Sequence, residues 1–497
     1  MPMDALFSVK PALAVLISIL AVPLIVWSGR RHPNRREGWT FLAAGVKFLI
    51  VASMVPAVLG GARLHLTVAQ VLPDVAIAFR VDAFGLLFAL VSSFLWIVTS
   101  AYSVGYMRGL DEHAQTRYFS FFALSMAATM GVAFSANLLT LYLFYEMLSF
   151  ATYPLVTHHQ DREARASGRK YLAFIVGGSI GLALPAMVVT YLLSGTLEFS
   201  ANGVLPETVA PEVLLVLALM FVFGFAKAGI MPFHAWLPAA MVAPTPVSAL
   251  LHAVAVVKVG AFSIFRVITG ILGPDRLVGS GVEVIISIIA AVTIIVSSLI
   301  ALSQDGLKRR LAFSTIGQLS YIVLGAALLT PSGLTGGMLH IAMHAFGKIT
   351  LFFCAGAIFV SAGVKNISEM AGIGRRMPIT MTAFFIGSLS VIGLPPCGGF
   401  ISKWFLLLGT LEARSYVMLA VILTSSLLNA AYFLPVVYRA FFRAPEQSGW
   451  DDTIREAPIW CLIPLKLTAF ASVILFLYPQ PFLRLARLAV GQILGGQ

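Results

Sequence analysis

Long apolar runs recur along this chain of 497 residues, separated by short loops that carry most of its charges. An α-helix needs about 20 consecutive apolar residues to cross the roughly 30 Å of hydrocarbon in a bilayer. Hydrophobic residues make up 59% of the chain and charged residues 11%, whereas a typical soluble domain has about 25% charged residues. The sequence therefore predicts an all-α integral membrane protein.

We predict about fourteen transmembrane segments, one for each long apolar run. Each should be a helix, because lipid offers no hydrogen bonds and the backbone must form its own within the segment. The first is expected to stay in the mature chain, since it is too long for a signal peptide and further spans follow it. The predicted spans are 11–29, 40–60, 82–107, 118–136, 138–157, 170–194, 212–231, 246–271, 283–303, 310–329, 334–362, 378–410, 416–441 and 459–480.

Two blocks of five predicted helices each contain a segment broken by proline, at Pro232 in the first block and at Pro395 and Pro396 in the second. Broken membrane helices mark ion pathways, because their freed carbonyls must meet protein or water. An odd number of helices makes the two blocks run in opposite directions, as in an inverted repeat. The expected units are three helices in 1–117, the repeats (helices 4–8 and 9–13) in 118–271 and 272–441, and one transmembrane helix in 442–497.

The net charge of +12 is explained by topology and requires no nucleic-acid partner. Lysine and arginine gather in alternate loops, at 30–36, 108–117, 162–170, 308–310, 365–376 and 439–455. Basic loops stay on the cytoplasmic side of a membrane. We therefore expect a multi-pass protein of the bacterial cytoplasmic (inner) membrane with both termini on the outer, periplasmic side.

Three cysteines lie far apart in or beside apolar segments, at Cys354, Cys397 and Cys461. This spacing forms neither a disulfide framework nor a CxxC metal site. We interpret them as small buried apolar residues. No metal, cofactor, redox or hydrolytic site is expected in this chain.

Four charged residues lie near the middle of predicted spans: Glu146, Lys227, Lys258 and Lys403. Such a group costs at least about 2.5–3.5 kcal/mol at the bilayer centre, so it usually lines an ion or proton path. The alternative is a set of buried ion pairs that only fix helix orientation. Three further basic residues carry less weight, because Lys47 and Lys466 are near enough to span ends to reach the interface and Arg266 ends its helix.

Lysine suits proton transfer because loss of hydration lowers the pKa of an ammonium group from about 10.4, while a nearby carboxylate raises it. A glutamate that approaches or leaves a lysine can thus change its protonation. The candidate pair is Glu146 with Lys227.

A second pattern is the spacing of His340, His344 and Lys348 at intervals of four residues. This spacing stacks three titratable groups along one helix face, about 6 Å apart. The pattern predicts a proton relay, to which His252 is added because it shares a predicted helix with Lys258. His234, beside the first proline break, is a candidate for the proton entrance.

Four segments resemble the proton-translocating antiporter-like membrane subunits: AKAGIMPFHAWLPAAMVAPTPVSALLHA, LYLFYEMLS, HAFGKITLFF and GLPPCGGFISKW. This family includes pump subunits M, N and L of respiratory complex I, the large subunits of Mrp-type sodium/proton antiporters and subunits of membrane-bound hydrogenases. The resemblance covers about residues 80–445. Lysine at position 403 favours the D-type large subunits of Mrp antiporters.

The resemblance implies a role for each matching residue. Glu146 would modulate Lys227, Lys258 would continue the path, Lys403 would end it, and His252, His340, His344 and Lys348 would link them. The implied function is that of a proton-translocating subunit in a multisubunit cation/proton antiporter. Its partners would be other membrane subunits, the lipid bilayer, protons and sodium.

Three alternatives remain open at this stage. The chain could be a proton-pumping subunit of an NADH-quinone oxidoreductase-like complex or a membrane-bound hydrogenase. It could be a stand-alone secondary solute transporter, which needs a substrate-sized cavity at the midplane. It could also be a structural subunit whose buried charges lock helices together.

Overall fold

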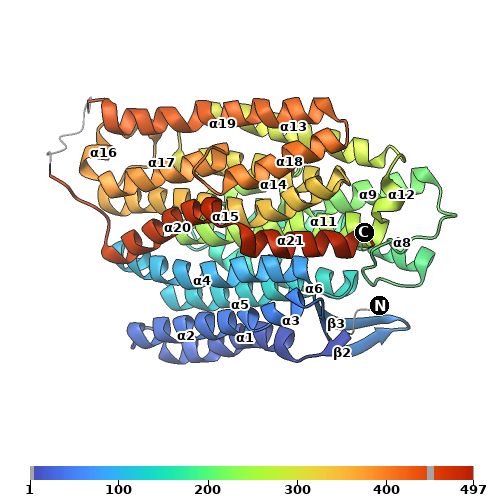
Figure 1. Cartoon of the computed structure of the whole chain (residues 1–497). Helices are drawn as coiled ribbons and strands as arrows, with labels where there is room; N and C mark the ends of the chain where they lie inside the picture. The colour runs from blue at the N-terminus through green and yellow to red at the C-terminus, as the bar shows by residue number, and fades with distance from the viewer. Residues whose placement is uncertain (1–4, 445–452, 496–497) are drawn as a thin grey trace.

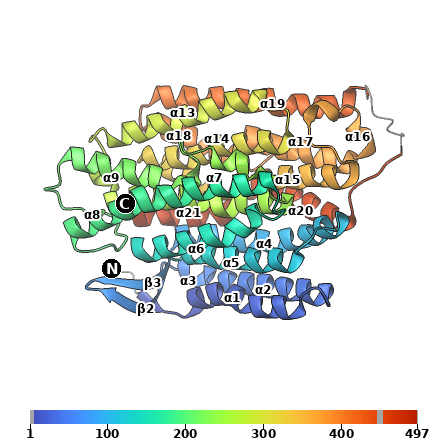
Figure 2. The same ribbon diagram turned by 180° about the vertical axis from the view of Figure 1, so that it is seen from behind.

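A computed structural model describes residues 5–444 and 453–495 of the chain. Its long helices run side by side, and a small sheet lies at one end of the bundle (Figures 1 and 2). The first and last described segments of the chain lie at the end of the bundle that carries the sheet (Figures 1 and 2). The side of a membrane on which the termini lie stays a prediction.

The helices fall into the order that the apolar runs predict. The N-terminal region contains α1 (Lys10–Ser28), α2 (Pro33–Ala52), α3 (Val55–Leu59) and α4 (Ala83–Gly109). The first block contains α5 (Gln115–Ala133), α6 (Leu138–Val156), α7 (Arg162–Gly178), η1 (Ser179–Ala183), α8 (Leu184–Ser194), α9 (Pro211–Gly224), η2 (Ala226–Ala228), α10 (Trp236–Ala239), η3 (Ala240–Val242), η4 (Val247–Ala255), α11 (Val256–Val267) and η5 (Ile268–Leu272).

A short helix, α12 (Pro274–Leu277), leads into the second block. This block contains α13 (Val282–Ser303), α14 (Leu307–Ala327), α15 (Pro331–Ala362), η6 (Ile367–Glu369), α16 (Ile373–Arg376), α17 (Pro378–Ile392), α18 (Gly399–Glu412) and α19 (Tyr416–Phe442). The chain continues through α20 (Ile459–Leu477) and α21 (Gln480–Ile493). Of these, η1, η4 and η5 are π-helical, and η2, η3 and η6 are 3-10 turns.

Each predicted span overlaps a helix or a run of consecutive helices. Within the described residues, nine helical stretches are long and apolar enough to cross a membrane, by length and composition. Two apolar helices, α9 and α17, are shorter because each stops at a break. The predicted all-α membrane fold is confirmed, and α21 is an additional helix that the apolar pattern did not indicate.

The second predicted span begins too late. The apolar pattern predicts a span over 40–60, but α2 starts at Pro33, because Arg36 and Glu37 in its first turns are buried and paired. Arg108 donates to both carboxylate oxygens of Glu37, and Arg36 also contacts Glu37 at 3.2 Å.

This shift also places Lys47 well inside α2. Its ammonium group is buried, donates to the carbonyl oxygen of Met126 at 2.9 Å and lies 4.7 Å from the ring centre of Trp96. The prediction that Lys47 reaches the interface is therefore wrong, whereas Lys466 on α20 is exposed.

The sheet at one end of the bundle was not predicted. It contains β1 (Ala5–Phe7), β2 (Arg63–Leu72) and β3 (Val75–Val81), in the order β1-β2-β3. β1 pairs with β2 in parallel, and β2 pairs with β3 as an antiparallel hairpin. A search for runs that span a membrane passes over this segment, because its pattern has the two-residue period of a strand.

Polar side chains start several of the long helices. Asp82 accepts from the Gly85 N–H at the start of α4, Asn137 accepts from Thr140 at α6, and Asp161 accepts from Ala164 at α7, all at 2.7–2.8 Å. These caps satisfy N–H groups that a helix leaves without partners. They fix where each helix begins.

In each of the two blocks, the chain breaks in the fourth predicted helix. In the first block, α9 stops and the chain passes through η2 and Pro232 to α10. In the second, Pro395 and Pro396 lie between α17 and α18. The predicted breaks are confirmed, and the inverted relation of the blocks stays a prediction.

Close contact between helices depends on glycine at the first break. A Cβ atom on Gly260 of α11 would lie 2.1 Å from the backbone N of Ala228 and 2.5 Å from the carbonyl carbon of Lys227. Helices in lipid pack through such small residues. Gly260 therefore lets α11 approach the backbone of η2 directly.

We expect Gly260→Ala to lower the thermal stability of the purified protein, at a typical overpacking cost of about 1–3 kcal/mol. Gly45→Ala on α2 is the matched control, because a Cβ there meets no atom within 4 Å. Melting curves in detergent compare the two. Equal melting temperatures for both variants would contradict the close approach of α11 to η2.

Candidate functional site

Lys227 lies in the 3-10 turn η2, where the first broken helix stops. Its side chain is fully buried, and its ammonium group donates to the Tyr145 carbonyl oxygen at 2.8 Å and to Ser149 Oγ at 2.6 Å. It also lies 3.1 Å from the ring centre of Tyr145. The break thus brings a lysine against α6.

Glu146 follows Tyr145 on α6, and both of its carboxylate oxygens are buried with no hydrogen bond to any described residue. It attracts Lys227 electrostatically. No ion pair within 4 Å joins the two among residues 5–444 and 453–495. The structure therefore brings the predicted pair into electrostatic range without direct contact.

Lys258 lies at the start of α11 and is fully buried. It donates to the carbonyl oxygen of Ala253 at 2.8 Å, in the π-helix η4 just before it. His252 lies on η4, faces Trp236 with ring centres 6.1 Å apart, and has no hydrogen bond from either ring nitrogen to a described residue. Both predicted residues therefore lie in the protein interior on one helical run.

His340 and His344 stack on α15, with ring centres 5.4 Å apart and planes inclined by only 10°. The Nδ1 atom of His340 lies 2.9 Å from Ser402 Oγ, and its Nε2 lies 3.1 Å from Gln318 Oε1. His344 makes no hydrogen bond with a described residue. The predicted alignment of these rings along one face is confirmed.

Lys348 continues the same face of α15 and is fully buried. It donates to Ser314 Oγ at 2.7 Å, and the hydroxyl of Tyr432 donates to the same oxygen at 2.9 Å. Tyr432 also contacts the amide oxygen of Asn429. A chain of polar groups therefore extends from Lys348 to α19.

Lys403 lies on α18, directly after the second break, and is buried. Its ammonium group donates to the carbonyl oxygen of Ile392, the last residue of α17, at 2.8 Å and to Ser426 Oγ at 3.1 Å. It lies 5.0 Å from the ring centre of Tyr321, whose ring lies 5.5 Å from that of His340. The two halves of the broken helix and α15 thus meet around one lysine.

The groups around α15 form one electrostatic cluster. His340 and His344 each interact with Lys258, Lys348 and Lys403, and Lys348 interacts with the other two lysines. Lys227 interacts with Glu146 and lies outside this cluster. The structure therefore brings five of the predicted residues together and places Glu146 and Lys227 as a separate pair.

A polar cavity of about 860 Å³ opens at the end of the bundle opposite the sheet. His234, the predicted entrance residue, lines it, and its Nδ1 has no hydrogen-bond partner among the described residues. The charged residues in its wall are Glu112, Asp161, Glu163, Lys170, Lys308, Arg309 and Lys365. This arrangement can hold water beside the first break.

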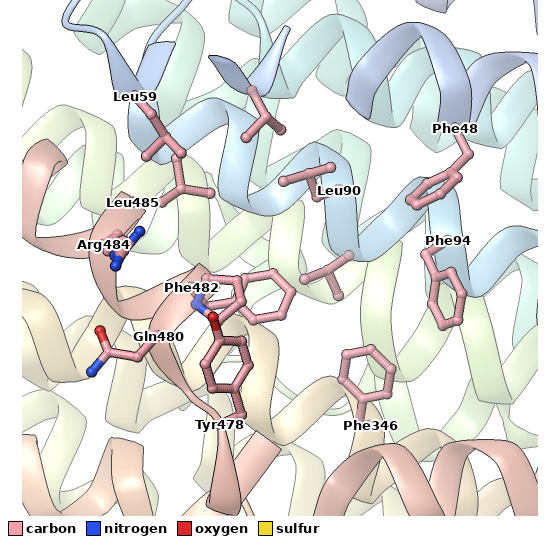
Figure 3. A pocket seen from close by; sticks show the side chains of 13 residues that line it. Phe48, Leu59, Leu90, Phe94, Phe346, Tyr478, Gln480, Phe482, Arg484 and Leu485 are labelled. Atoms are coloured by element: carbon pink, nitrogen blue, oxygen red, sulfur yellow. The ribbon is translucent and has the colours of Figure 1, made fainter. Parts of the chain in front are cut away.

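A second cavity, of about 380 Å³, is apolar (Figure 3). Phe48, Leu90 and Phe94 face Phe482 and Leu485 of α21 across it (Figure 3). Its lining includes none of the predicted site residues, so this cavity is separate from the buried lysines and histidines.

An ion pair near the sheet end of the bundle is not indicated by the sequence pattern. Arg266 of α11 is buried, and its two terminal nitrogens each lie 2.6 Å from an oxygen of Asp82 at the start of α4. Asp82 is the first residue of the third predicted span, 82–107, and a charge at a span end does not by itself indicate a buried partner. Arg266 carries little weight in the sequence because it ends its predicted helix, although a charge in an apolar segment is the signal that identifies it.

The sequence matches the family model described as "NADH:quinone oxidoreductase/Mrp antiporter, TM" over residues 135–429. The NADH-quinone oxidoreductase subunit N of Desulforudis audaxviator is 33% identical over 403 residues, which are 78% of this chain and 79% of that protein. The A/B component of a probable K⁺/H⁺ antiporter of Rhizobium meliloti is 30% identical over 90% of this chain and 45% of its own length.

The A1 component of a Na⁺/H⁺ antiporter of Staphylococcus aureus is 27% identical over 93% of this chain and 60% of its own length. The chain thus spans about half the length of the two antiporter components. Among solved structures, the Mrp complex from Dietzia sp. DQ12-45-1b matches with a TM-score of 0.87 and 22% identity, over 98% of both chains. The archaeal membrane-bound sulfane sulfur reductase matches with a TM-score of 0.88 and 24% identity, also over 98% of both. Both matches show the fold.

We expect Asp82→Ala to destabilise the protein by about 3–5 kcal/mol, because it leaves the guanidinium group of Arg266 buried without its partner. Glu207→Ala, which removes an exposed carboxylate, is the control and should unfold like the wild type. The readout is the unfolding free energy in detergent. A loss below about 1 kcal/mol for Asp82→Ala would count against the pair as a structural lock.

Proposed function

We propose that this chain, which belongs to the family of NADH:quinone oxidoreductase and Mrp antiporter transmembrane subunits, moves protons as one subunit of a multisubunit cation/proton antiporter. The relatives in Rhizobium meliloti and Staphylococcus aureus are named as subunits of K⁺/H⁺ and Na⁺/H⁺ antiporters. The exchanged cation is therefore sodium or potassium. The protein lies in the bacterial cytoplasmic membrane, with the sheet end outside.

One observation carries the proposal: buried ionisable groups lie at both helix breaks and also on α11 and α15. Protons enter from the cavity lined by His234 and reach Lys227, which Glu146 attracts. Lys258, His344 and His340 then pass them toward Lys403. Ionisable groups inside a membrane are costly, and proton relays are among the roles for which they are retained.

At each helix break, the structure provides hydrogen-bond acceptors for a buried lysine. At the second break, the ammonium group of Lys403 contacts the last carbonyl of α17, where the helix dipole favours a positive charge. At the first break, the indole N–H of Trp236 donates to the carbonyl oxygen of Ala226. The ammonium group of Lys227 donates instead to a carbonyl oxygen of α6. Lys403 can hold a proton at the end of the path, and Lys227 can exchange one near the entrance.

A second candidate is proton pumping driven by redox chemistry in partner subunits. The observation that favours it is the NADH-quinone oxidoreductase subunit N, which matches this chain over similar shares of both proteins. In either case the chain supplies the proton path, and other membrane subunits supply the coupling reaction. The two candidates differ in what drives the protons.

We expect Lys227→Ala and Lys403→Ala each to reduce proton transport at least about tenfold in everted membrane vesicles, with assembly of the complex retained. Removal of either lysine takes away the titratable group that lies at its break, and the path is interrupted there. Lys466→Ala is the matched control, because this lysine lies in a membrane helix but is exposed.

Transport at wild-type rates in both variants would refute the relay. Loss of the assembled complex, measured by purification in mild detergent, would instead assign these lysines a structural role. The control separates these outcomes from a general sensitivity to the loss of positive charge.

Two measurements on vesicles separate the two candidates. In the first, sodium or potassium salts are added after a pH gradient has been imposed, and in the second, NADH and quinone are added and proton uptake is recorded. We expect sodium or potassium to dissipate the gradient in vesicles that contain the complex. Proton uptake that depends on NADH and is indifferent to both cations would favour the redox-driven candidate.

A further inference from the structure

Three histidines surround one carboxylate outside the membrane-spanning segments, at the rim of the polar cavity. Glu112 and His113 lie in the loop between α4 and α5, and His158 and His159 follow α6. One ring nitrogen of each histidine lies 3.6–3.8 Å from the Oε2 atom of Glu112. Two loops that are far apart in the sequence thus meet around one oxygen atom.

His158 is the most informative member of this cluster. Its side chain is fully buried, and neither of its ring nitrogens makes a hydrogen bond with a described residue. Its Nε2 lies 3.6 Å from the Glu112 carboxylate. A buried imidazole without hydrogen bonds is costly unless another ligand occupies the space that it faces.

The hydrogen bonds of the cluster leave Nδ1 of His113 free to bind a metal ion. The Nε2 atom of His113 lies 3.0 Å from the carbonyl oxygen of His158, which can only accept, so this nitrogen carries the hydrogen. Its Nδ1 atom therefore presents a lone pair toward Glu112. Arg117 donates to the same carbonyl at 2.7 Å and fixes the loop backbone. This is the outer support that metal-binding histidines commonly have.

The protonation states also suit a metal. Burial lowers the pKa of His158, so its imidazole is neutral near pH 7. Burial raises the pKa of the Glu112 carboxyl, but the electrostatic effect of the neighbouring histidines outweighs it, and the net pKa lies below the ordinary value. Neutral imidazole and ionised carboxylate are the forms that bind metal ions.

We propose that Glu112, His113 and His158 bind a Zn²⁺ ion, with His159 or water as the fourth ligand. The ligand atoms of the first three residues lie within 4.8 Å of one another. Two ligand atoms on a Zn²⁺ tetrahedron with bonds of about 2.0–2.1 Å are about 3.3–3.4 Å apart, so small ring rotations complete the site. Imidazole nitrogens and a carboxylate oxygen are ligands that zinc prefers.

The proposed ion would link the α4–α5 loop to the α6–α7 loop. Glu112 and His159 also line the polar cavity, so the ion would lie at its rim. The cluster goes beyond the proposed function, because none of its residues is one of the proton-relay residues named above. The sequence pattern predicts no metal site, since the spacing of 45 residues between His113 and His158 hides the cluster from motif searches.

The test is titration of the full-length purified chain with Zn²⁺ by calorimetry, with metal content measured after gel filtration. We expect one Zn²⁺ per chain. His158→Ala and Glu112→Gln should weaken binding about 10–100-fold or more, since a lost ligand costs at least as much as a lost outer-shell partner. His32→Ala, which removes an exposed histidine from another loop, is the matched control and should bind like the wild type.

Co²⁺ provides a second readout, because tetrahedral coordination gives visible absorption bands that the variants should lose. If His158→Ala fails to fold by gel filtration, His113→Ala and His159→Ala replace it, since both side chains are partly exposed. The proposal is overturned if the wild-type chain shows no saturable Zn²⁺ binding. It is also overturned if the cluster variants bind Zn²⁺ as tightly as His32→Ala.

Discussion

The need to solvate an ammonium group without water shapes the interior of this protein. Lys47, Lys227, Lys258 and Lys403 each donate to a backbone carbonyl oxygen, and Lys348 donates to a serine hydroxyl. A charged group in an apolar medium is tolerated only when such partners are supplied. For Lys258 and Lys403 the acceptor belongs to irregular or terminal backbone, since Ala253 lies in the π-helix η4 and Ile392 ends α17 at the second break.

The irregular segments of the chain lie where this need is greatest. Lys227 is in the 3-10 turn after α9, Lys258 follows the π-helix η4, and Lys403 follows the gap between α17 and α18. Small residues then let neighbouring helices close around these segments, as Gly260 does at η2. Backbone breaks, close packing and buried charge are therefore parts of one arrangement, and the proton path that we propose depends on all three.

Much of the fold could be predicted from the sequence, because crossing a bilayer demands long apolar helices and proline breaks them. The start of α2 could not, since the burial of Glu37 depends on its ion pair with Arg108, which is distant in the sequence. The buried charges could also be predicted from the apolar runs, because a charged residue in the middle of such a run stands out. Their partners could not, because Ser314, Gln318 and Tyr432 are ordinary residues until tertiary packing brings them to Lys348 and His340.

The cluster on α15 contains basic groups alone. Three lysines and two histidines interact with one another, and within the described part of the chain no carboxylate lies within 4 Å of any of them. Neighbouring positive charges repel, so a proton on one of these groups disfavours a proton on the others. In the proposed path, the arrival of a proton at the cluster would thus favour the departure of another. Transfer through it would resemble the knock-on passage of ions along a single-file pore.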